Sequence, residues 1–438
     1  MLYLKQERIV WKNWSESVVA HPKTIFTPND LEELILFVKQ CAEKNMTIRV
    51  VGAGHSFTPL VATNEALVSL DNLSGVFEVN NKEKLATVWA GTRLRDVGPL
   101  LFEYGYAMEN LGDTNAQSIA GATSTGTHGT GVNFRSISNQ IEGLTLLTAS
   151  GELIEINRNE NNQYFDAARV ALGMFGIIVK VTLRVVDAYM LQEKSYRLTL
   201  DKGLESLERL KKSNRNFEFF WFPYTNLIQV KTLNEVGTDV MPPERSHSFK
   251  KLAVENGLFW ILSEMSRNIP STSRLVSKVS ALGIPTGEEQ NRSYIQYITP
   301  RLVKFNEMEY CVPEEAMADV IRDIESYFNR KKIDVHFPLE CRYVKGDSIW
   351  LSPSYKRDSA YIAVHMYKGM DFSEFFEEVE EIFFAYDGRP HWGKMHTLQF
   401  DQIEKLYPKV DDFLKLRKKL DPNGMFLNEY LRSMFAID

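Results

Sequence analysis

A short glycine-rich turn that ends on a histidine is the feature that most constrains this chain. Residues 52–56 read Gly-Ala-Gly-His-Ser and follow the apolar run 48–51, which predicts a strand that leads into the turn. Glycine adopts positive φ and lets other groups approach the backbone, so such a turn can surround a phosphate with bare N–H groups. His55 would then lie beside the nucleotide that carries the phosphate. A plain strand and loop with a core histidine gives the same pattern, so both interpretations stay open at this point.

A second cluster of small residues spans 121–131 and reads Gly-Ala-Thr-Ser-Thr-Gly-Thr-His-Gly-Thr-Gly. Four glycines and five hydroxyl side chains provide many hydrogen-bond donors and little bulk that would block a flat ligand. The Lys-Ser/Thr pair of a P-loop is absent after Gly126, and Gly52-Ala53-Gly54 does not lead to the third glycine of a Rossmann fingerprint. We therefore expect that a nucleotide cofactor, if bound, is held by two separate loops.

Length, charge and cysteine content exclude several classes of protein. A chain of 438 residues exceeds the usual size of a single core, which predicts two domains. The net charge of −6 comes without a basic stripe, so nucleic acid is not expected as a partner. Three widely spaced cysteines without a CxxC pair favour neither a disulfide framework nor a metal site, and they suit a reducing compartment. Because no apolar run resembles a signal peptide or a transmembrane segment, we expect a cytoplasmic protein.

Hydrophobic periodicity predicts mixed α and β structure along the chain. The predicted helices cover residues 31–42, 93–105 and 403–420, and the predicted strands cover 48–51, 66–70, 75–79, 85–90 and 361–367, with a hairpin over 141–157. The stretch 236–246 contains two prolines and is predicted to be an exposed loop. The pattern is that of an α+β protein.

The stretch 336–343 alternates as a strand does, so Glu340 and Arg342 project from the same face and Cys341 from the other. A carboxylate beside a guanidinium can bind the hydroxyls of a polyol or a sugar lactone, because the first accepts their protons and the second donates to their oxygens. A surface ion pair between strands explains the same two residues, and in isolation it is the stronger explanation.

A third cluster, Arg-Pro-His-Trp-Gly-Lys-Met-His at 389–396, places Lys394 near His391 and His396. The lysine can polarise a substrate hydroxyl or stabilise a reduced, anionic flavin. The two histidines are five residues apart and no carboxylate has ligand spacing, so no metal site is predicted. His365 lies in the strand 361–367, where it either faces the same cleft or is a hydrogen-bonded core histidine.

These clusters, in this order, resemble the vanillyl-alcohol-oxidase type of FAD-linked flavoproteins, and among them the aldonolactone oxidases. The resemblance rests on both glycine clusters, on residues 167–178 and on the C-terminal segments 336–342, 351–353, 388–394 and 420–431. It covers almost the whole chain and implies a two-domain fold. Residues 1–187 would form the FAD-binding domain, residues 188–400 a substrate-binding cap on an antiparallel sheet flanked by helices, and residues 401–438 a segment that returns to the FAD domain.

The resemblance also implies roles for individual residues. His55 would carry the FAD covalently through its 8α-methyl group, and Ile178 would approach the adenine. Glu340 and Arg342 would orient the substrate hydroxyls, while Lys394 would polarise the reacting oxygen and balance charge on the reduced flavin. The other implied cofactor contacts are Gly52, Ala53, Gly54, Ser56, Ser118, Gly121, Thr125, His128, Gly129 and His391.

The implied reaction is the oxidation of a sugar-1,4-lactone of the L-gulono or D-arabinono type, with transfer of hydride to the flavin and reoxidation by molecular oxygen to give hydrogen peroxide. The resemblance leaves open an alditol oxidase that acts on xylitol or sorbitol, and a lactone dehydrogenase with another electron acceptor. His365 departs from the aliphatic residue expected in the animal-type enzymes, so the preferred sugar stays open. A nucleotide-binding protein without redox chemistry is the remaining alternative.

Overall fold

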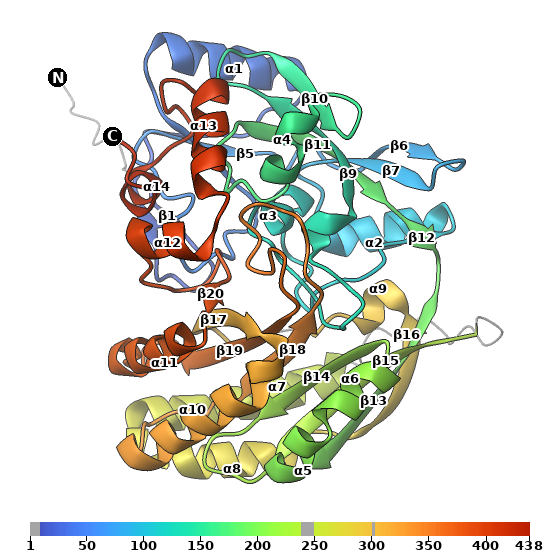
Figure 1. The fold of residues 1–438 in the computed structure, drawn as a ribbon, viewed down its shortest axis with the longest axis vertical. Helices are drawn as coiled ribbons and strands as arrows, with labels where there is room; N and C mark the ends of the chain where they lie inside the picture. The colour runs from blue at the N-terminus through green and yellow to red at the C-terminus, as the bar shows by residue number, and fades with distance from the viewer. Residues whose placement is uncertain (1–8, 238–248, 300–302) are drawn as a thin grey trace.

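The computed structural model describes residues 9–237, 249–299 and 303–438, and Figure 1 shows two halves stacked along the long axis of the molecule. The upper half holds a parallel sheet of three strands in the order β3-β5-β4 and an antiparallel sheet of five strands in the order β10-β9-β11-β7-β6. Two short pairs, β1-β2 and β8-β12, complete its strands within the described residues. The strands are β1 (Trp11–Lys12), β2 (Val19–Ala20), β3 (Thr24–Phe26), β4 (Ile48–Val51), β5 (Ala66–Ser69), β6 (Val76–Asn80), β7 (Leu85–Trp89), β8 (Tyr106–Ala107), β9 (Ile141–Leu147), β10 (Leu153–Asn157), β11 (Ile177–Arg184) and β12 (Val186–Asp187).

The helices of this half follow from local sequence. In α1, Asp30 caps the first turn by accepting a hydrogen bond from the Glu33 N–H. Leu34, Val38 and Cys41 recur at helical spacing and are buried. The helices that connect the strands of this half are α1 (Leu31–Glu43), α2 (Leu94–Glu103), α3 (Ile119–Ser124), the 3₁₀ turn Ile137–Gln140 and α4 (Asn162–Ala168).

The lower half is built on one antiparallel sheet in the order β16-β13-β15-β14-β18-β19-β17-β20. Its strands are β13 (Met190–Leu198), β14 (Asn216–Trp221), β15 (Ile228–Val236), β16 (Gly287–Arg292), β17 (Phe305–Pro313), β18 (Leu339–Val344), β19 (Ser359–Tyr367) and β20 (Arg389–Pro390). Its helices are α5 (Leu200–Glu205), α6 (Leu207–Ser213), α7 (Phe249–Asn268), α8 (Ser273–Gly283), α9 (Ser293–Gln296), α10 (Met317–Lys331) and α11 (Ser373–Ala385), with 3₁₀ turns at Pro270–Thr272 and Glu314–Ala316. The expected α+β architecture, with an antiparallel sheet flanked by helices, is confirmed.

The last segment of the chain crosses back to the upper half (Figure 1). The Ile48 N–H donates to the Met425 carbonyl at 2.8 Å, and the Asn428 amide donates to the carbonyls of Pro59 and Ala62. This segment contains α12 (Phe400–Leu406), α13 (Val410–Leu420) and α14 (Glu429–Met434). The domain boundaries at 187 and 400 stay predictions.

Most predicted elements are confirmed, but the single helix predicted over 403–420 is wrong. The structure has two helices there, because the chain leaves helical geometry at Tyr407 (φ −120°, ψ 88°). Pro408 disfavours the α conformation of the residue before it and lacks the N–H that a continuous helix needs. The predicted loop 236–246 lies almost wholly outside the described residues. In the described ranges, no helix combines the length and the apolar character needed to cross a membrane.

The two faces of the large sheet differ in character. Cys341 and Tyr343 project from one face, are almost fully buried, and belong to the apolar core together with residues of α10. Glu340 and Arg342 project from the other face, towards the upper half, where the Gly131 N–H donates to the Tyr343 carbonyl and the Tyr343 N–H to the Thr130 hydroxyl. The alternation predicted for this strand is therefore confirmed, and its polar side faces the upper half, where Asp113 lies 3.4 Å from Arg342.

Candidate active site

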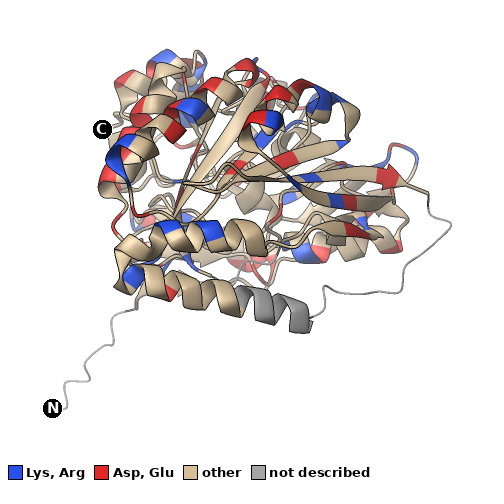
Figure 2. Cartoon of the chain, turned by 90° about the horizontal axis from the view of Figure 1, so that it is seen from below, with Lys and Arg blue, Asp and Glu red and all other residues tan. Residues whose placement is uncertain are grey.

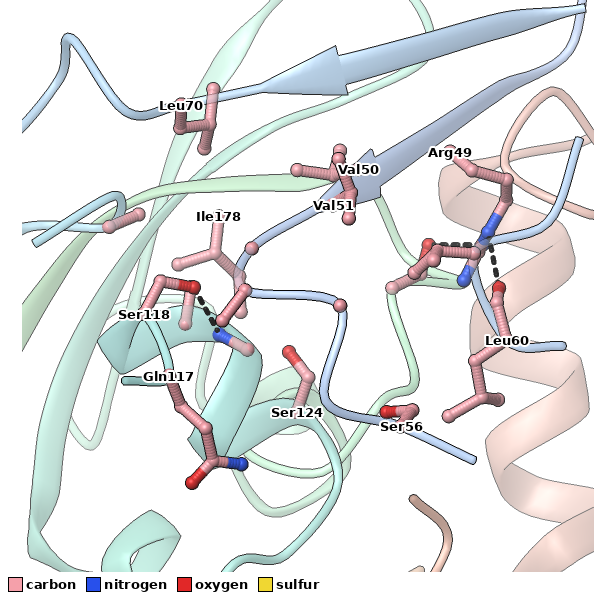
Figure 3. A pocket seen from close by; sticks show the side chains of 18 of the residues that line it. Arg49, Val50, Val51, Ser56, Leu60, Leu70, Gln117, Ser118, Ser124 and Ile178 are labelled. Atoms are coloured by element: carbon pink, nitrogen blue, oxygen red, sulfur yellow. Dashed lines mark hydrogen bonds between the residues drawn. The ribbon is translucent and has the colours of Figure 1, made fainter. Parts of the chain in front are cut away.

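A groove opens in the upper half between the turn after β4, the start of α3 and the segment 172–178 (Figure 3). It holds about 1000 Å³ of empty space, part of it continuous with solvent. Nine of the sequence-predicted cofactor residues line it: Gly52, Ala53, Gly54, His55, Ser56, Ser118, Gly121, Thr125 and Ile178. The two segments singled out by their glycines thus converge on one cavity.

Six of the residues that line the groove are glycines, so part of its wall is bare backbone. A Cβ on Gly52 would lie 2.4 Å from the Ser118 hydroxyl oxygen, and Gly54 has a φ of +64°, which disfavours any other residue. Ser118 caps α3 by accepting a hydrogen bond from the Gly121 N–H. The second cluster therefore begins as a helix and not as the loop that the sequence suggested. This exposed backbone suits the pyrophosphate of FAD, and Val50, Leu70 and Ile178 supply apolar walls for its rings (Figure 3).

Arg49 connects the segments that form the groove. Its guanidinium is buried and donates to the carbonyls of Leu60, Leu172, Gly173 and Phe426. Burial lowers the pKa of Arg49 to about 10, so the group stays charged at neutral pH. One side chain thereby joins β4, the segment after α4 and the C-terminal segment.

His55 lies at the edge of the groove and stacks on Trp14, with ring centroids 5.3 Å apart. Its Nδ1 lies 3.3 Å from the Ala53 carbonyl oxygen, the geometry of a donated hydrogen bond, which assigns the lone pair to Nε2. Burial lowers the pKa of His55, and the positive charges of Lys394 and Arg93 lower it further. The imidazole is therefore neutral and nucleophilic at physiological pH.

The polar face of the sheet carries a buried network around Arg342. The guanidinium forms ion pairs with Glu340, with Glu218 at 2.8 Å and with Asp113 at 3.4 Å. Lys231 contacts Glu218 from the next strand at 3.4 Å. Glu340 and Arg342 are 4% and 8% exposed, so the surface ion pair that the sequence left open is wrong. Burial alone would lower the pKa of Arg342, but the three carboxylates raise it well above its ordinary value.

A second polar group on the same face surrounds Lys394. Its ammonium forms an ion pair with Glu307 on β17, and it lies 5.3 Å from the centre of the Phe57 ring. His365 on β19 is the direct partner of Glu307 across the ladder, and its Nε2 lies 3.5 Å from the same carboxylate. The Nδ1 of His365 interacts with the Pro338 carbonyl at 3.1 Å, and the ring is 4% exposed. His365 is thus both a hydrogen-bonded core residue and a neighbour of Lys394.

Three predicted cofactor residues do not line the groove. His128 is buried 3.4 Å from Glu309, and His391 lies behind it, with ring centroids 5.9 Å apart. His391 accepts a hydrogen bond from the Gly393 N–H and its carbonyl accepts one from Lys394, so it shapes the turn that carries the lysine. Burial lowers the pKa of His391 to about 3.

A Cβ on Gly129 would lie 2.1 Å from the Leu111 carbonyl oxygen, so close packing alone explains why this position is a glycine. The contacts of His128, Gly129 and His391 with the cofactor stay predictions.

Sequence reasoning missed the carboxylates that hold these cations. Glu307 and Glu309 alternate with apolar residues on β17 and are about 5% exposed. The sequence signal that could have identified them is a pair of acidic residues, two positions apart, within an otherwise apolar strand. Glu218 and Lys231 carry a similar signal on β14 and β15, where each interrupts a run of buried apolar residues.

Comparison with known proteins agrees with this geometry. Residues 22–157 match a family described as "FAD binding domain", and residues 181–434 match one described as "D-arabinono-1,4-lactone oxidase". The chain is 36% identical to a protein of Mycobacterium tuberculosis named L-gulono-1,4-lactone dehydrogenase, over 98% of this chain and 99% of the relative. It is 31% identical to the L-gulonolactone oxidase of Bos taurus, over 98% of both.

A solved structure of cholesterol oxidase from Brevibacterium sterolicum superposes with a TM-score of 0.83, at 18% identity, and covers 98% of this chain and 97% of that one. At this identity the likeness concerns the fold alone, and it confirms the two-domain fold of the vanillyl-alcohol-oxidase type. The second family model spans more than half of the chain, and the relatives match it nearly end to end. The chain therefore belongs to the D-arabinono-1,4-lactone oxidase family of FAD-dependent oxidoreductases.

Proposed function

We propose that this protein oxidises sugar-1,4-lactones of the L-gulono or D-arabinono type, with FAD attached covalently to His55 and molecular oxygen as the electron acceptor. The observation that carries the proposal is the buried pairing of Glu340 with Arg342 on the sheet face that also holds Lys394. Buried charges are costly, so a network of this kind between two halves of a protein points to a polar ligand that it binds. The names of the two full-length relatives support the lactone as that ligand.

The residues of the sheet face have separate roles in substrate binding. Glu340 accepts hydrogen bonds from substrate hydroxyls, and Arg342, already positioned by Glu218 and Asp113, donates to substrate oxygens. FAD, when bound, would supply a two-electron acceptor that takes one hydride from the carbon that bears the hydroxyl next to the carbonyl, while the proton of that hydroxyl is released to water. Lys394 donates a hydrogen bond to the oxygen of that hydroxyl and stabilises negative charge that develops beside it. Glu307 keeps the ammonium in place through its ion pair.

His55 is the proposed tether. Its Nε2 bears the lone pair when Nδ1 donates to Ala53, and burial keeps the ring neutral, so this nitrogen could bond to the 8α-carbon of the flavin. The C–N bond would replace one C–H bond of the 8α-methyl group, and the two electrons and two protons released would pass to molecular oxygen. The tether is tested by acid precipitation of the purified protein. Yellow colour should remain with the pellet in the wild type and in His21→Ala, a loop histidine that is exposed, and should be lost from the pellet in His55→Ala. Free FAD in the wild-type supernatant would disprove the covalent bond.

The substrate class is tested by comparing kcat/KM for L-gulono- and D-arabinono-1,4-lactone with that for xylitol and sorbitol. We expect the lactones to be preferred, since Arg342 can donate to a ring carbonyl that the polyols lack. Faster turnover of the polyols would identify an alditol oxidase instead.

A lactone dehydrogenase is the second candidate, because the Mycobacterium tuberculosis relative bears that name. The proposal of an oxidase predicts one hydrogen peroxide released per lactone consumed in air. Turnover that stays below one tenth of the rate with an artificial dye acceptor, measured under the same conditions, would favour the dehydrogenase.

A further inference from the structure

The turn that carries His55 is held by two residues that follow β1 in the chain. The Trp14 N–H donates to the Gly54 carbonyl at 2.7 Å, and the Asn13 side-chain amide donates to the Ser56 carbonyl at 3.0 Å. The residues on both sides of the histidine are therefore hydrogen-bonded to neighbours that lie far away in the sequence. These contacts fix the backbone from which the imidazole projects.

The orientation of the His55 ring also depends on Trp14. The χ2 torsion of a histidine has broad minima, so the plane of its ring must be fixed by neighbours. Trp14 stacks on the imidazole with ring centroids 5.3 Å apart and an angle of 25° between the planes. The contact of Nδ1 with the Ala53 carbonyl determines which edge of the ring carries Nε2. The stacking and the hydrogen bond together define where the lone pair of Nε2 lies.

Trp14 is held in turn by the lower half of the molecule. Its ring meets Phe305, the first residue of β17, edge to face at a centroid distance of 5.3 Å. Glu16 forms ion pairs with Lys304 at 2.7 Å and with Lys368 at 2.8 Å, next to the ends of β17 and β19. Hydrogen bonds from the two lysines lower the pKa of Glu16 to about 2, so it is charged at neutral pH. The segment after β1 therefore connects the histidine turn with these two strands.

We propose that Trp14 is a positioning residue for the covalent attachment of FAD, because it holds the His55 imidazole in the orientation that presents Nε2 to the flavin. The inference rests on the proposed bond between His55 and FAD. In that step Nε2 bonds to the 8α-carbon, a C–H bond of the methyl group and the N–H bond of the imidazole break, and two electrons and two protons reduce molecular oxygen to hydrogen peroxide. Trp14 exchanges neither electrons nor protons. It acts by restricting the ring to orientations from which the bond can form.

A tryptophan that only fills space would behave differently from a positioning residue. Its truncation would destabilise the protein and weaken flavin binding together. Trp14 does not line the groove that His55 borders, so its truncation should leave the space for the cofactor unchanged and slow only the formation of the bond. The two roles are therefore distinguished by measuring the total flavin and the covalent flavin separately.

The test follows attachment in full-length protein from riboflavin-limited cells, incubated in air with FAD. Absorbance per polypeptide gives the total flavin. The mass of the acid-denatured chain gives the covalent share, because a tethered chain gains the mass of FAD less two hydrogen atoms. In Trp14→Leu attachment should slow at least about fivefold, as expected for the loss of one ring-stacking contact, while the total flavin stays that of the wild type.

Two further variants separate stacking from the loss of a large side chain. Trp14→Phe keeps an aromatic ring over His55 and should recover at least about half of the wild-type rate. Trp350→Leu is the matched control, because Trp350 is also half-buried, packs under Lys409 and does not line the groove. It should attach FAD at the wild-type rate.

Glu16→Gln tests whether the segment must be anchored to the lower half. It removes two exposed ion pairs and should slow attachment about twofold. Since charges of both signs are interspersed on the helices and strands seen in Figure 2, these ion pairs act as a local contact that salt weakens directly. Added salt should therefore slow attachment in the wild type more than in Glu16→Gln.

Equal attachment rates in the wild type and Trp14→Leu would overturn the inference and leave the bond to His55 intact. A wild type that never gains the added mass would show that the proposed bond is wrong, and the inference would fall with it. Parallel loss of total flavin, covalent flavin and melting temperature in Trp14→Leu, without rescue by Trp14→Phe, would assign Trp14 a structural role. If Trp14→Leu does not fold, equal rates in Glu16→Gln and the wild type at low salt would reject the inference.

Discussion

At the scale of single residues, the two cations of the candidate site, Lys394 and Arg342, are each held by carboxylates. Lys394 depends on Glu307, and Arg342 depends on Glu340, Glu218 and Asp113. Each network fixes the direction in which its cation can donate a hydrogen bond. A surface lysine or arginine is flexible, so its donor direction is not fixed.

Replacing Lys394 should lower turnover far more than it lowers stability. In Lys394→Met the substrate oxygen loses its charged donor, and loss of one such donor typically lowers kcat by about 10²- to 10³-fold. Glu307→Gln should lower kcat less, because the ammonium remains but is no longer held by an ion pair. Lys405→Met, at an exposed position of α12, serves as the control. Lys394→Met with wild-type kcat would remove the lysine from the proposed reaction.

The pH dependence of stability should reflect His336. Burial lowers the pKa of His336 to about 4, below the ordinary value of 6.5. Between pH 6.5 and 4 the unfolded chain binds a proton that the folded one does not, so the contribution is complete above pH 6.5 and is lost as the pH falls to 4. From pH 7.5 to 4.5 this amounts to about 2–3 kcal/mol in the free energy of unfolding.

His336→Gln should therefore flatten that pH dependence, as measured by urea unfolding at pH 4.5 and 7.5. His21→Gln, at an exposed loop position, should leave it as in the wild type. If the slopes of the wild type and His336→Gln are equal, protonation of His336 is not coupled to unfolding.

At the scale of elements, the turn after β4 shows how a strand end becomes a cofactor contact. In Gly54→Ala the new Cβ must accept a φ of +64° and a contact of 3.2 Å with Trp11. The left-handed conformation alone costs alanine about 1–2 kcal/mol. We expect a protein that unfolds at lower temperature and retains less flavin, measured by absorbance per polypeptide. Gly257→Ala in α7, where a Cβ meets nothing within 4 Å, should lower neither the unfolding temperature nor the amount of retained flavin.

Apolar periodicity alone can give the wrong boundaries or the wrong buried side of a helix. The stripe of apolar residues over 403–420 is real, but Pro408 divides it into α12 and α13. Conversely, α7 and α8 expose several large apolar side chains and bury several serines, so apolar periodicity alone does not identify the buried side of these helices.

At the scale of the whole molecule, the C-terminal segment closes the upper half through Asn428. Its amide donates to Pro59 and Ala62, and its Oδ1 accepts from the Leu431 N–H to cap α14. Asn428→Asp keeps the cap but cannot donate, so it separates the two functions. We expect both Asn428→Asp and Asn428→Ala to lose about 1–3 kcal/mol of stability and to retain less flavin, measured by thermal unfolding and absorbance. Asn428→Asp with wild-type stability would show that only the cap matters.

Local sequence was enough to predict the turn at 52–56, helix α1, the hairpin 141–157 and the alternation of Glu340, Cys341 and Arg342. Each depends on backbone preferences and periodicity within about a dozen residues. The resemblance to a known family then implied FAD and the two-domain fold, which the family comparisons confirm.

Tertiary structure alone decided which residues meet. Glu307 faces His365 and Lys394 only because β17, β19 and the turn after β20 are brought together by pairing between distant strands. Burial of the Glu340–Arg342 pair likewise depends on the upper half that covers this sheet face. Sequence determines which groups are available and which face of an element they occupy. The distances between them, and hence their charge states and chemistry, are set by long-range packing that no local pattern records.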